Sequence, residues 1–279
     1  MATPLLSTKD FVVKYELMAK KALGQNFLLD GNITDKIVRS SLQVQGLEGL
    51  AGETAAEVGP GPGGLTQAVL KQNPQSMTVI EMDERCLAIL GEIKEFYSQL
   101  EIVNGDALKF DWEKLYQKSG AFHIFSNLPY NISVVLLTGW LKQIKHFKSL
   151  TLMFQKEVGD RILAKPDSKD YGRISVISQL QCEVVKLFDL PPTCFVPAPK
   201  IWSSVLLFRP KDDSLSANIL DKIEKLTALA FGQRRKMIRQ SLKSVPNIQD
   251  ILEKLGISPT FRAENLTPSD YLHIAKSLV

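Results

Sequence analysis

The chain has 279 residues, of which 44% are hydrophobic and 23% are charged, and a net charge of +4. This composition can bury one large core with a smaller unit beside it, whereas no apolar run approaches the roughly 18 residues of a membrane-spanning helix. The N-terminus lacks the basic-then-apolar order of a signal peptide, and Cys86, Cys182 and Cys194 form no C-x-x-C pair. We therefore expect a cytoplasmic, monomeric protein with neither a disulfide framework nor a metal site, and a charge that permits a polyanionic partner.

Apolar runs of strand length recur over the first three quarters of the chain. Helix-length segments separate most of them, which is typical of βαβ units and of a mostly parallel sheet covered on both faces. A proline-rich segment joins the last two runs, which favours an antiparallel edge pair. We predict an α/β fold with a seven-stranded sheet and one reversed strand, its strands lying near residues 54–58, 77–82, 100–103, 122–125, 150–154, 184–187 and 205–208.

The pattern changes after the last predicted strand. Residues 209–214 have the composition of a linker, and from about Asn218 the pattern is helical, with stops at Pro246, Pro259 and Pro268. We therefore predict one large domain over residues 1–211, which includes an N-terminal extension over 1–25, and a small helical domain over 212–279.

A glycine-rich loop follows the first predicted strand and opens a helix, so its backbone can turn tightly and approach a ligand. Gly59, Gly61 and Gly64 fit the G-x-G-x-x-G pattern of dinucleotide enzymes. Gly59, Gly61 and Gly63 fit the G-x-G-x-G pattern of S-adenosylmethionine enzymes. Two prolines inside the loop remove N–H donors that a pyrophosphate would use, which favours the second pattern.

Polar side chains end three successive predicted strands. Glu81 lies 22 residues after Gly59, where a carboxylate accepts hydrogen bonds from ribose hydroxyls. Asp106 can accept from an adenine 6-amino group, or it can form an Asx turn or helix cap. Asn127 follows the next strand. Because the carboxyl ends of parallel strands meet at one edge, we expect these three side chains to line one crevice.

The tetrapeptide Asn127-Leu128-Pro129-Tyr130 stands at this edge. Asn127 offers a side-chain acceptor, and Pro129 has no N–H, which leaves neighbouring backbone carbonyls as further acceptors. Tyr130 adds an aromatic face on which a planar base can stack. The run predicts a clamp for the exocyclic amine of a base, and the alternative is an ordinary turn that ends at a proline.

Taken together, these motifs resemble those of the ribosomal small-subunit RNA adenine dimethyltransferases, the KsgA family. The resemblance covers nearly the whole chain after residue 20. It implies a class I methyltransferase (Rossmann-like) fold, a small C-terminal α-helical RNA-binding domain, and S-adenosyl-L-methionine as cofactor. It also implies dimethylation of the N6 amines of two adjacent adenosines near the 3′ end of 16S ribosomal RNA, within the small subunit or its precursor. Further matching stretches are Gly24-Gln25-Asn26-Phe27-Leu28, Gln155-Lys156-Glu157-Val158, Tyr171-Gly172-Arg173, Phe195-Val196-Pro197-Ala198-Pro199-Lys200 and Phe231-Gly232-Gln233-Arg234-Arg235-Lys236.

Roles for individual residues follow from the chemistry of the amine, from the glycine pattern and from the resemblance. For catalysis, we hypothesise that the Asn127 side-chain oxygen and the Pro129 carbonyl accept the two N–H bonds of the amine. Tyr130 and Phe195 would then hold the extruded base, although a Phe in a proline-rich loop is more often a core residue. The expected cofactor-binding residues are Asn26, Leu28, Gly59, Gly61, Gly63, Glu81, Asp106 and Asn127.

A basic cluster near the end of the chain predicts contact with RNA phosphates. It contains no acidic residue and consists of Arg234, Arg235, Lys236, Arg239 and Lys243. Lys236, Arg239 and Lys243 share one face of a predicted helix, with Ile238 and Leu242 toward the core. The alternative is a solvated basic helix.

Three other functions stay open on the sequence. One is a non-catalytic RNA-binding assembly factor on the same fold, which the complete set of acceptors disfavours. Another is the related large-subunit RNA dimethyltransferase of the macrolide-resistance type, which the stretches around Phe195 and Gln155 disfavour. The third is a nicotinamide dehydrogenase, which the loop prolines disfavour.

Overall fold

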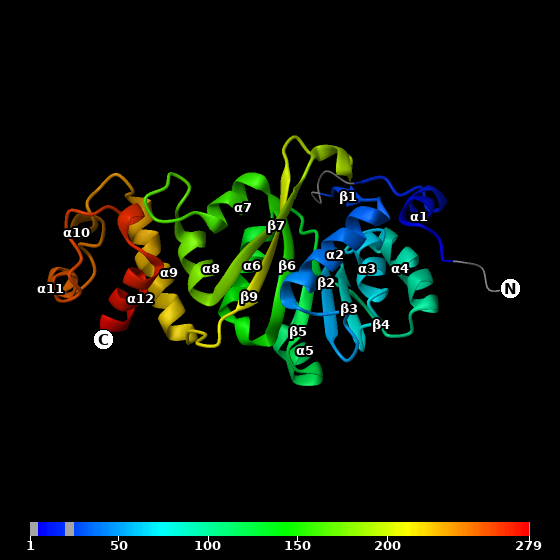
Figure 1. Cartoon of the computed structure of the whole chain (residues 1–279), viewed down its shortest axis with the longest axis horizontal. Coiled ribbons are helices and arrows are strands. Elements are labelled where there is room, and N and C mark those ends of the chain that lie inside the picture. Colours follow the sequence, from blue (N-terminus) through cyan, green and yellow to red (C-terminus); the bar gives the residue numbers. More distant parts are fainter. Residues whose placement is uncertain (1–4, 20–24, 279) are drawn as a thin grey trace. The chain divides into compact units, whose positions relative to one another are not determined.

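The computed structural model describes residues 5–19 and 25–278, arranged in two compact units (Figure 1). Unit 1 comprises Met1–Leu136, Lys145–Lys156 and Val185–Phe208. Unit 2 comprises Leu137–Ile144, Glu157–Val184 and Arg209–Val279. The chain therefore passes between the units several times, whereas the predicted domains divide it once, after residue 211.

A seven-stranded sheet forms the framework, in the order β4-β3-β2-β5-β6-β9-β7. Strands β2 to β6 run parallel, and β9 runs antiparallel to β6. The predicted sheet and its one reversed strand are thus confirmed. The reversed strand β9 lies between β6 and β7, and β7 forms the edge of the sheet. The strands are β2 (Thr54–Val58), β3 (Ser76–Glu81), β4 (Leu100–Asn104), β5 (Phe122–Ser126), β6 (Phe147–Gln155), β7 (Cys182–Leu190) and β9 (Ser203–Pro210).

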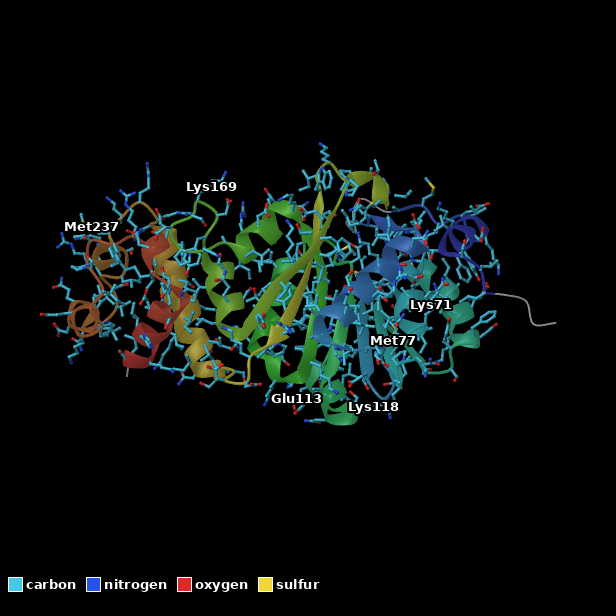
Figure 2. All side chains as sticks on the ribbon, viewed as in Figure 1. Lys71, Met77, Glu113, Lys118, Lys169 and Met237 are labelled. Carbon is cyan, nitrogen blue, oxygen red and sulfur yellow. The ribbon has the colours of Figure 1, made fainter. Side chains whose placement is uncertain are left out.

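Crossover helices connect the parallel strands of unit 1. Every residue of β2 and β5 is buried, as expected for central strands covered on both faces. Met77 on β3 is fully buried, whereas the side chain of Lys71, after α3, is half exposed; both are labelled in Figure 2. The crossover helices are α3 (Gly64–Leu70), α4 (Glu84–Phe96), α5 (Trp112–Ser119) and α6 (Ser133–Lys142), the last of which continues into unit 2, and α2 (Gly31–Gln45) precedes β2.

Aspartates begin three of these helices. Asp30, Asp83 and Asp111 each accept a hydrogen bond from a backbone N–H in the first turn of α2, α4 and α5 respectively. Such caps satisfy amides that have no partner within the helix. The cap at Asp83 matters most for function, because it places a carboxylate directly after β3.

The N-terminal residues of unit 1 pack onto α4 and onto a distant loop. Helix α1 (Thr8–Lys14) is followed by Tyr15, and both Lys14 and Tyr15 donate hydrogen bonds to Glu92 of α4. Strand β1 (Phe27–Leu28) pairs antiparallel with β8 (Phe195–Val196), which follows the short turn η3 (Pro192–Cys194). Gly24 of the predicted motif lies outside the described residues.

Unit 2 is mainly helical. The ring of Phe231 packs between two tyrosines, T-shaped against Tyr171 and tilted against Tyr271, with ring centroids 5.9 Å apart in each pair. No helix runs through Pro268: η4 ends at Asn265, and Pro268 occupies the first turn of α12, where its missing N–H costs nothing. Beyond α7 (Lys156–Leu163), which begins in unit 1, the helices are α8 (Arg173–Gln181), α9 (Ala217–Gly232), α10 (Ile238–Ser241), α11 (Ile248–Lys254) and α12 (Pro268–Ser277), with short turns η2 (Ile144–His146) and η4 (Ala263–Asn265).

The basic segment does not form the long helix that its spacing predicts. Helix α10 covers only four residues, so Lys236 precedes it and Lys243 follows it. Met237 forms a β-bridge with Arg262, and the N–H of Ile238 bonds to the carbonyl of Phe261. These long-range bonds replace helical ones, so the predicted helical face is wrong, although Ile238 is buried as expected.

Candidate active site

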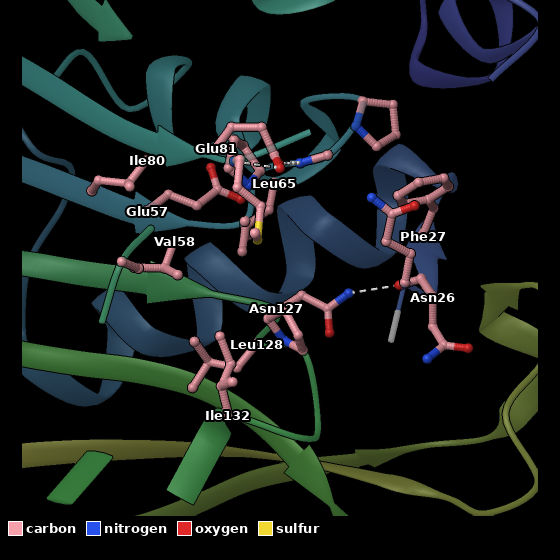
Figure 3. Close-up of a pocket in the computed structure, with 18 of the residues that line it drawn as sticks. Asn26, Phe27, Glu57, Val58, Leu65, Ile80, Glu81, Asn127, Leu128 and Ile132 are labelled. Atoms are coloured by element: carbon pink, nitrogen blue, oxygen red, sulfur yellow. Dashed lines mark hydrogen bonds between the residues drawn. The ribbon is translucent and has the colours of Figure 1, made fainter. Parts of the chain in front are cut away.

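A cavity in unit 1 opens at the carboxyl ends of β2, β3 and β5 (Figure 3). The glycine loop, β1 and the turn after β5 complete its wall. The structure brings most of the predicted residues together here, but Gly63 and Phe195 do not line the cavity. The predicted residues that line it are Asn26, Leu28, Gly59, Gly61, Glu81, Asp106, Asn127, Pro129 and Tyr130.

The glycine loop reaches both β1 and the turn after β5. Gly59 and Gly61 have positive φ angles of 65° and 53°, which favour glycine. A Cβ atom on Gly59 would lie 3.6 Å from Cδ of Pro129, and one on Gly61 would lie 3.0 Å from the Phe27 ring. The glycine loop therefore lies directly beside the tetrapeptide Asn127-Leu128-Pro129-Tyr130. Gly63 instead caps α3 in the left-handed conformation, which is a role in the fold.

Glu81 is held at the end of β3 by backbone donors. Its Oε2 accepts from Gly61 N at 3.0 Å, and its Oε1 accepts from Met82 N and Asp83 N at 2.9 and 2.8 Å. Burial raises the pKa of this carboxyl, while the backbone N–H groups oppose the shift. Because a carboxylate has about four acceptor sites, Glu81 keeps capacity for a further hydroxyl donor.

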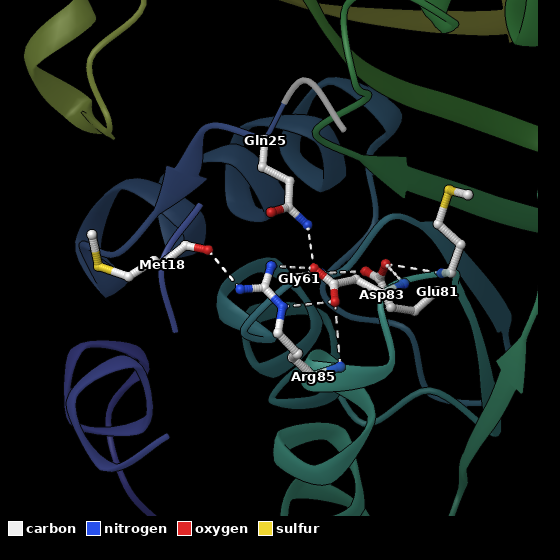
Figure 4. A network of polar contacts seen from close by, with 7 residues as sticks. Met18, Gln25, Gly61, Glu81, Asp83 and Arg85 are labelled. Carbon is white, nitrogen blue, oxygen red and sulfur yellow. Dashed lines mark hydrogen bonds and ion pairs between the residues drawn. The ribbon is translucent and has the colours of Figure 1, made fainter. Parts of the chain in front are cut away.

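A polar network next to Glu81 fixes the N-terminal residues (Figure 4). Arg85 donates two hydrogen bonds to Asp83, at 2.9 and 2.6 Å, and a third to the Met18 carbonyl at 2.8 Å. Gln25, which lines the cavity, donates to the same carboxylate at 2.9 Å. The hydrogen bonds from Arg85 lower the pKa of Asp83 to about 2. The sequence analysis did not predict this network, since its members are remote from one another in the chain.

Asp106 combines the two roles that the sequence left open. Its Oδ1 accepts a hydrogen bond from Leu108 N at 2.9 Å, which is an Asx turn. The residue also lines the cavity, and its side chain is partly exposed. The turn thus fixes Oδ1, whereas Oδ2 lies 4.0 Å from the exposed ammonium of Lys109 and can accept a hydrogen bond from a ligand.

Asn127 has a defined amide orientation. Its Nδ2 donates to the backbone carbonyl of Asn26 at 2.9 Å. Figure 3 shows the amide nitrogen turned toward Asn26 and the side-chain oxygen turned away from it. The neighbouring Ser126 hydroxyl donates to the Val58 carbonyl at 2.6 Å, which ties the end of β5 to the end of β2. The oxygen of Asn127 is therefore an acceptor at a fixed position.

The two residues at the end of the tetrapeptide are also held in place. The Pro129 carbonyl accepts from Ile132 N at 3.1 Å, which uses one of its two lone pairs. The Tyr130 hydroxyl lies 2.7 Å from the Ser203 hydroxyl. Burial raises the pKa of Tyr130, so its phenol is neutral at physiological pH.

Phe195 occupies the core rather than the cavity. Its side chain is only 2% exposed and lies on β8, opposite Leu28 of β1. The alternative that the sequence left open for Phe195, a residue of the core, therefore describes its position. No local pattern in the sequence signals that residues 27–28 pair with residues 195–196, because the pairing joins distant parts of the chain.

Glu57 is a cavity residue that the sequence analysis missed. It is buried on β2, lines the cavity and accepts a hydrogen bond from Thr66 Oγ1 at 2.7 Å. Burial raises the pKa of Glu57 to about 8, so the carboxyl is mainly neutral at pH 7. The signal for it was a lone acidic residue in an otherwise apolar strand, directly before the glycine loop.

The basic cluster lies in unit 2 and is only partly free to bind. Arg234 donates to Glu264 at 2.8 Å and to the Ser168 carbonyl at 3.1 Å, so it holds two loops together. The side chains of Arg235, Lys236, Arg239 and Lys243 are exposed, as is Met237 between them (Figure 2).

Two kinds of feature are absent from residues 5–19 and 25–278. Within these ranges, no group of three or more His, Cys, Asp or Glu side chains is placed to hold a metal ion. No helix in the same ranges is long and apolar enough to cross a membrane.

Comparisons with known proteins give a consistent result. The model of the family described as "Ribosomal RNA adenine dimethylase" matches residues 17–279. "Ribosomal RNA small subunit methyltransferase A" of Chelativorans sp. (strain BNC1) is 46% identical over 274 residues, which cover 97% of each chain. A dimethyladenosine transferase from Plasmodium falciparum has a crystal structure that matches with a TM-score of 0.74 at 25% identity, covering 88% of this chain and 94% of that one. The 23S rRNA methyltransferase ErmE shares the fold, with a TM-score of 0.66 at 22% identity over 91% of this chain and 99% of its own.

Proposed function

Since the chain belongs to the ribosomal RNA adenine dimethylase family, we propose that it transfers methyl groups from S-adenosyl-L-methionine to adenosines of small-subunit ribosomal RNA. The products are N6,N6-dimethyladenosines at two adjacent positions near the 3′ end of that RNA, formed during maturation of the subunit. The observation that carries the proposal is the fixed side chain of Asn127, which lines the same cavity as the glycine loop.

The chemistry requires an acceptor at this position. The lone pair of an adenine 6-amino nitrogen is delocalised into the ring, so the amine is a poor nucleophile. Hydrogen bonds from its two N–H groups to Asn127 Oδ1 and the Pro129 carbonyl would draw it toward tetrahedral geometry and free the lone pair. Since Pro129 already accepts from Ile132 N, it would use its second lone pair. Tyr130 would stack on the extruded base.

The cavity residues fit the cofactor by their donor and acceptor chemistry. S-adenosyl-L-methionine, when bound, supplies the methyl carbon on a sulfonium sulfur. Glu81 would accept from one ribose hydroxyl, and the second oxygen of Asp106 would accept from the adenine amine. Gly59 and Gly61 leave room for the ligand beside the loop, and the two prolines of the loop, Pro60 and Pro62, suit a ligand without phosphate groups. Asn26 and Leu28 would contact the cofactor from the side of the cavity that β1 forms.

Phe195 is proposed as a core residue rather than a stacking residue, because its side chain is buried. The exposed cations Arg235, Lys236, Arg239 and Lys243 are proposed to contact RNA phosphates. Arg234 is proposed to support their loop through Glu264.

The test is methylation of small ribosomal subunits that lack the two modifications. Incubation with the protein and S-adenosyl-L-methionine should yield N6,N6-dimethyladenosine, which mass spectrometry of the nucleosides detects. Large subunits serve as the control substrate. Methylation of the large subunit alone would favour the large-subunit activity, and methylation of neither would favour a non-catalytic assembly factor.

A further inference from the structure

The segment from β8 to the start of β9 carries three exposed apolar side chains in unit 1, here called the apolar cluster. Val196, Ile201 and Trp202 are exposed, and 49% of the Trp202 surface is accessible. About half of the Trp202 surface is therefore free to contact a partner, and neighbouring exposed apolar residues mark sites of interaction. The cluster is therefore a candidate binding surface outside the cavity.

Hydrogen bonds fix this cluster beside the candidate active site. The Trp202 carbonyl accepts from Lys156 N at 2.8 Å, and the next residue, Ser203, pairs with Gln155 at the carboxyl end of β6. The Ser203 hydroxyl lies 2.7 Å from that of Tyr130, which lines the cavity. Trp202 is thus the residue directly before Ser203, which contacts Tyr130 in the wall of the cavity.

The charge of the loop fits a polyanion. No acidic residue occurs in the sequence between Asp189 and Asp212, and Lys200 is exposed two residues before Trp202. Asp189 itself reaches Ser204, but its carboxylate is paired with Lys186 at 2.8 Å. An exposed aromatic ring beside a cation is the combination that single-stranded RNA requires, with stacking for a base and charge for a phosphate.

We propose that Trp202 stacks on an unpaired RNA base next to the adenosine whose amine enters the cavity, an inference that rests on the proposed function. Extruding one adenosine removes a stacking partner from its neighbour in the strand. An indole ring outside the cavity replaces that partner, and Lys200 neutralises a nearby phosphate. Such stacking tolerates any base, so this contact supplies affinity rather than sequence selection.

The tryptophans of the chain allow a direct measurement. The chain has three, and Trp112 and Trp140 are 6% and 1% exposed, so acrylamide quenching of fluorescence reports mainly on Trp202. The probe is an unmethylated transcript of the 3′ region of small-subunit ribosomal RNA, added to the full-length protein. We expect the RNA to shield Trp202 from acrylamide.

Substitutions test whether this contact contributes affinity. Trp202→Ala should weaken binding of the transcript about tenfold, since stacking on one base is worth about 1–3 kcal/mol, with cofactor affinity unchanged. Trp202→Phe keeps an aromatic face and should bind within about threefold of the parent. Phe96→Ala on α4, where Phe96 is 47% exposed, is the matched control and should bind normally.

Two results would overturn the inference. One is an unshielded Trp202 in a protein that methylates small subunits normally. The other is a Trp202→Ala variant with unchanged RNA affinity but altered self-association in sedimentation, which would make the cluster a protein interface. By contrast, a parent protein that binds the transcript with Trp202 shielded but methylates no subunit would contradict the proposed function and leave the RNA contact standing.

Discussion

The cavity and the basic cluster differ in what holds their functional groups. In the cavity, Glu81 and Asn127 are fixed by hydrogen bonds to the backbone of other segments. In the basic cluster, Lys236 and Lys243 extend from turns on either side of a four-residue helix and are exposed. The activity of a preorganised site depends on the position of each atom, whereas the affinity of exposed charges for a polyanion depends on their total number. Single substitutions should therefore have large effects in the first region and small effects in the second.

The largest effect is expected for Asn127→Ala. Removing an acceptor aimed at the reacting group costs about 10²–10³-fold in rate when the rest of the site is intact. Cofactor affinity should weaken but stay measurable, because Glu81 and the glycine loop are unchanged. Single-turnover transfer of tritiated methyl groups and calorimetric cofactor titration measure the two quantities. Asn32→Ala, at an exposed position in the first turn of α2, is the control. Near-normal turnover by Asn127→Ala would exclude the proposed clamp.

A smaller effect is expected for Gly64→Ala. The new Cβ would lie 2.7 Å from the Leu28 carbonyl oxygen, which is backbone and must shift with β1. We expect a loss of about 1–3 kcal/mol in the free energy of unfolding and weaker cofactor binding, measured by urea denaturation and calorimetry. Gly91→Ala, within α4, meets no atom within 4 Å and should stabilise the protein by about 0.5–1 kcal/mol. Equal effects of the two substitutions would contradict the close approach of β1.

Asp83→Asn should remove a stabilisation that depends on pH. The pKa of Asp83 is lowered to about 2 in the folded protein, from an ordinary value of 3.8. The carboxylate therefore stabilises the fold above about pH 4, and this contribution is lost as the pH falls toward 2. We expect a difference of roughly 1–2 kcal/mol at neutral pH, reduced because the partly exposed Arg85 is screened by solvent.

Urea unfolding of the parent and of Asp83→Asn at pH values from about 6 down to 3 measures this difference. It should shrink as the pH falls. Asp35→Asn, which removes the exposed pair with Lys71, is the control and should change stability by less than about 1 kcal/mol. A difference between parent and Asp83→Asn that stays constant across this range would show that the carboxylate charge is not what stabilises the network.

The fold was predictable because its signals are local. Each buried strand is a short apolar run, and prolines between the last two runs prevented a crossover helix, so the reversed β9 followed. The pairing of β1 with β8 was not predictable. It joins two-residue strands from distant parts of the chain, and neither residues 27–28 nor residues 195–196 carry a sequence pattern that predicts which residues pair. The same pairing buries Phe195, which explains why a residue suggested by resemblance lies in the core.

The site was predictable where residues end parallel strands, since topology alone brings Glu81, Asp106 and Asn127 to one edge. Residues that act through another side chain were missed. Arg85 and Gln25 meet at Asp83 only in the folded chain. Likewise, Glu264 pairs with Arg234 from far along the sequence, so an acid-free window in the sequence did not remain acid-free in space.

The smallest effects are expected in the basic cluster, where Arg234 and Arg239 can be compared directly. Arg239→Gln should lower the slope of log affinity against log salt by about 1 for RNA binding, with cofactor affinity and stability unchanged. Arg234→Gln should instead reduce stability by about 1 kcal/mol, because it leaves Glu264 without its partner. Filter binding of the RNA transcript over a series of salt concentrations, together with urea unfolding, separates the two. If neutralising Lys236, Arg239 and Lys243 together left the salt slope unchanged, the phosphate contacts would lie elsewhere, and the exposed charges of unit 2 would serve solubility rather than binding.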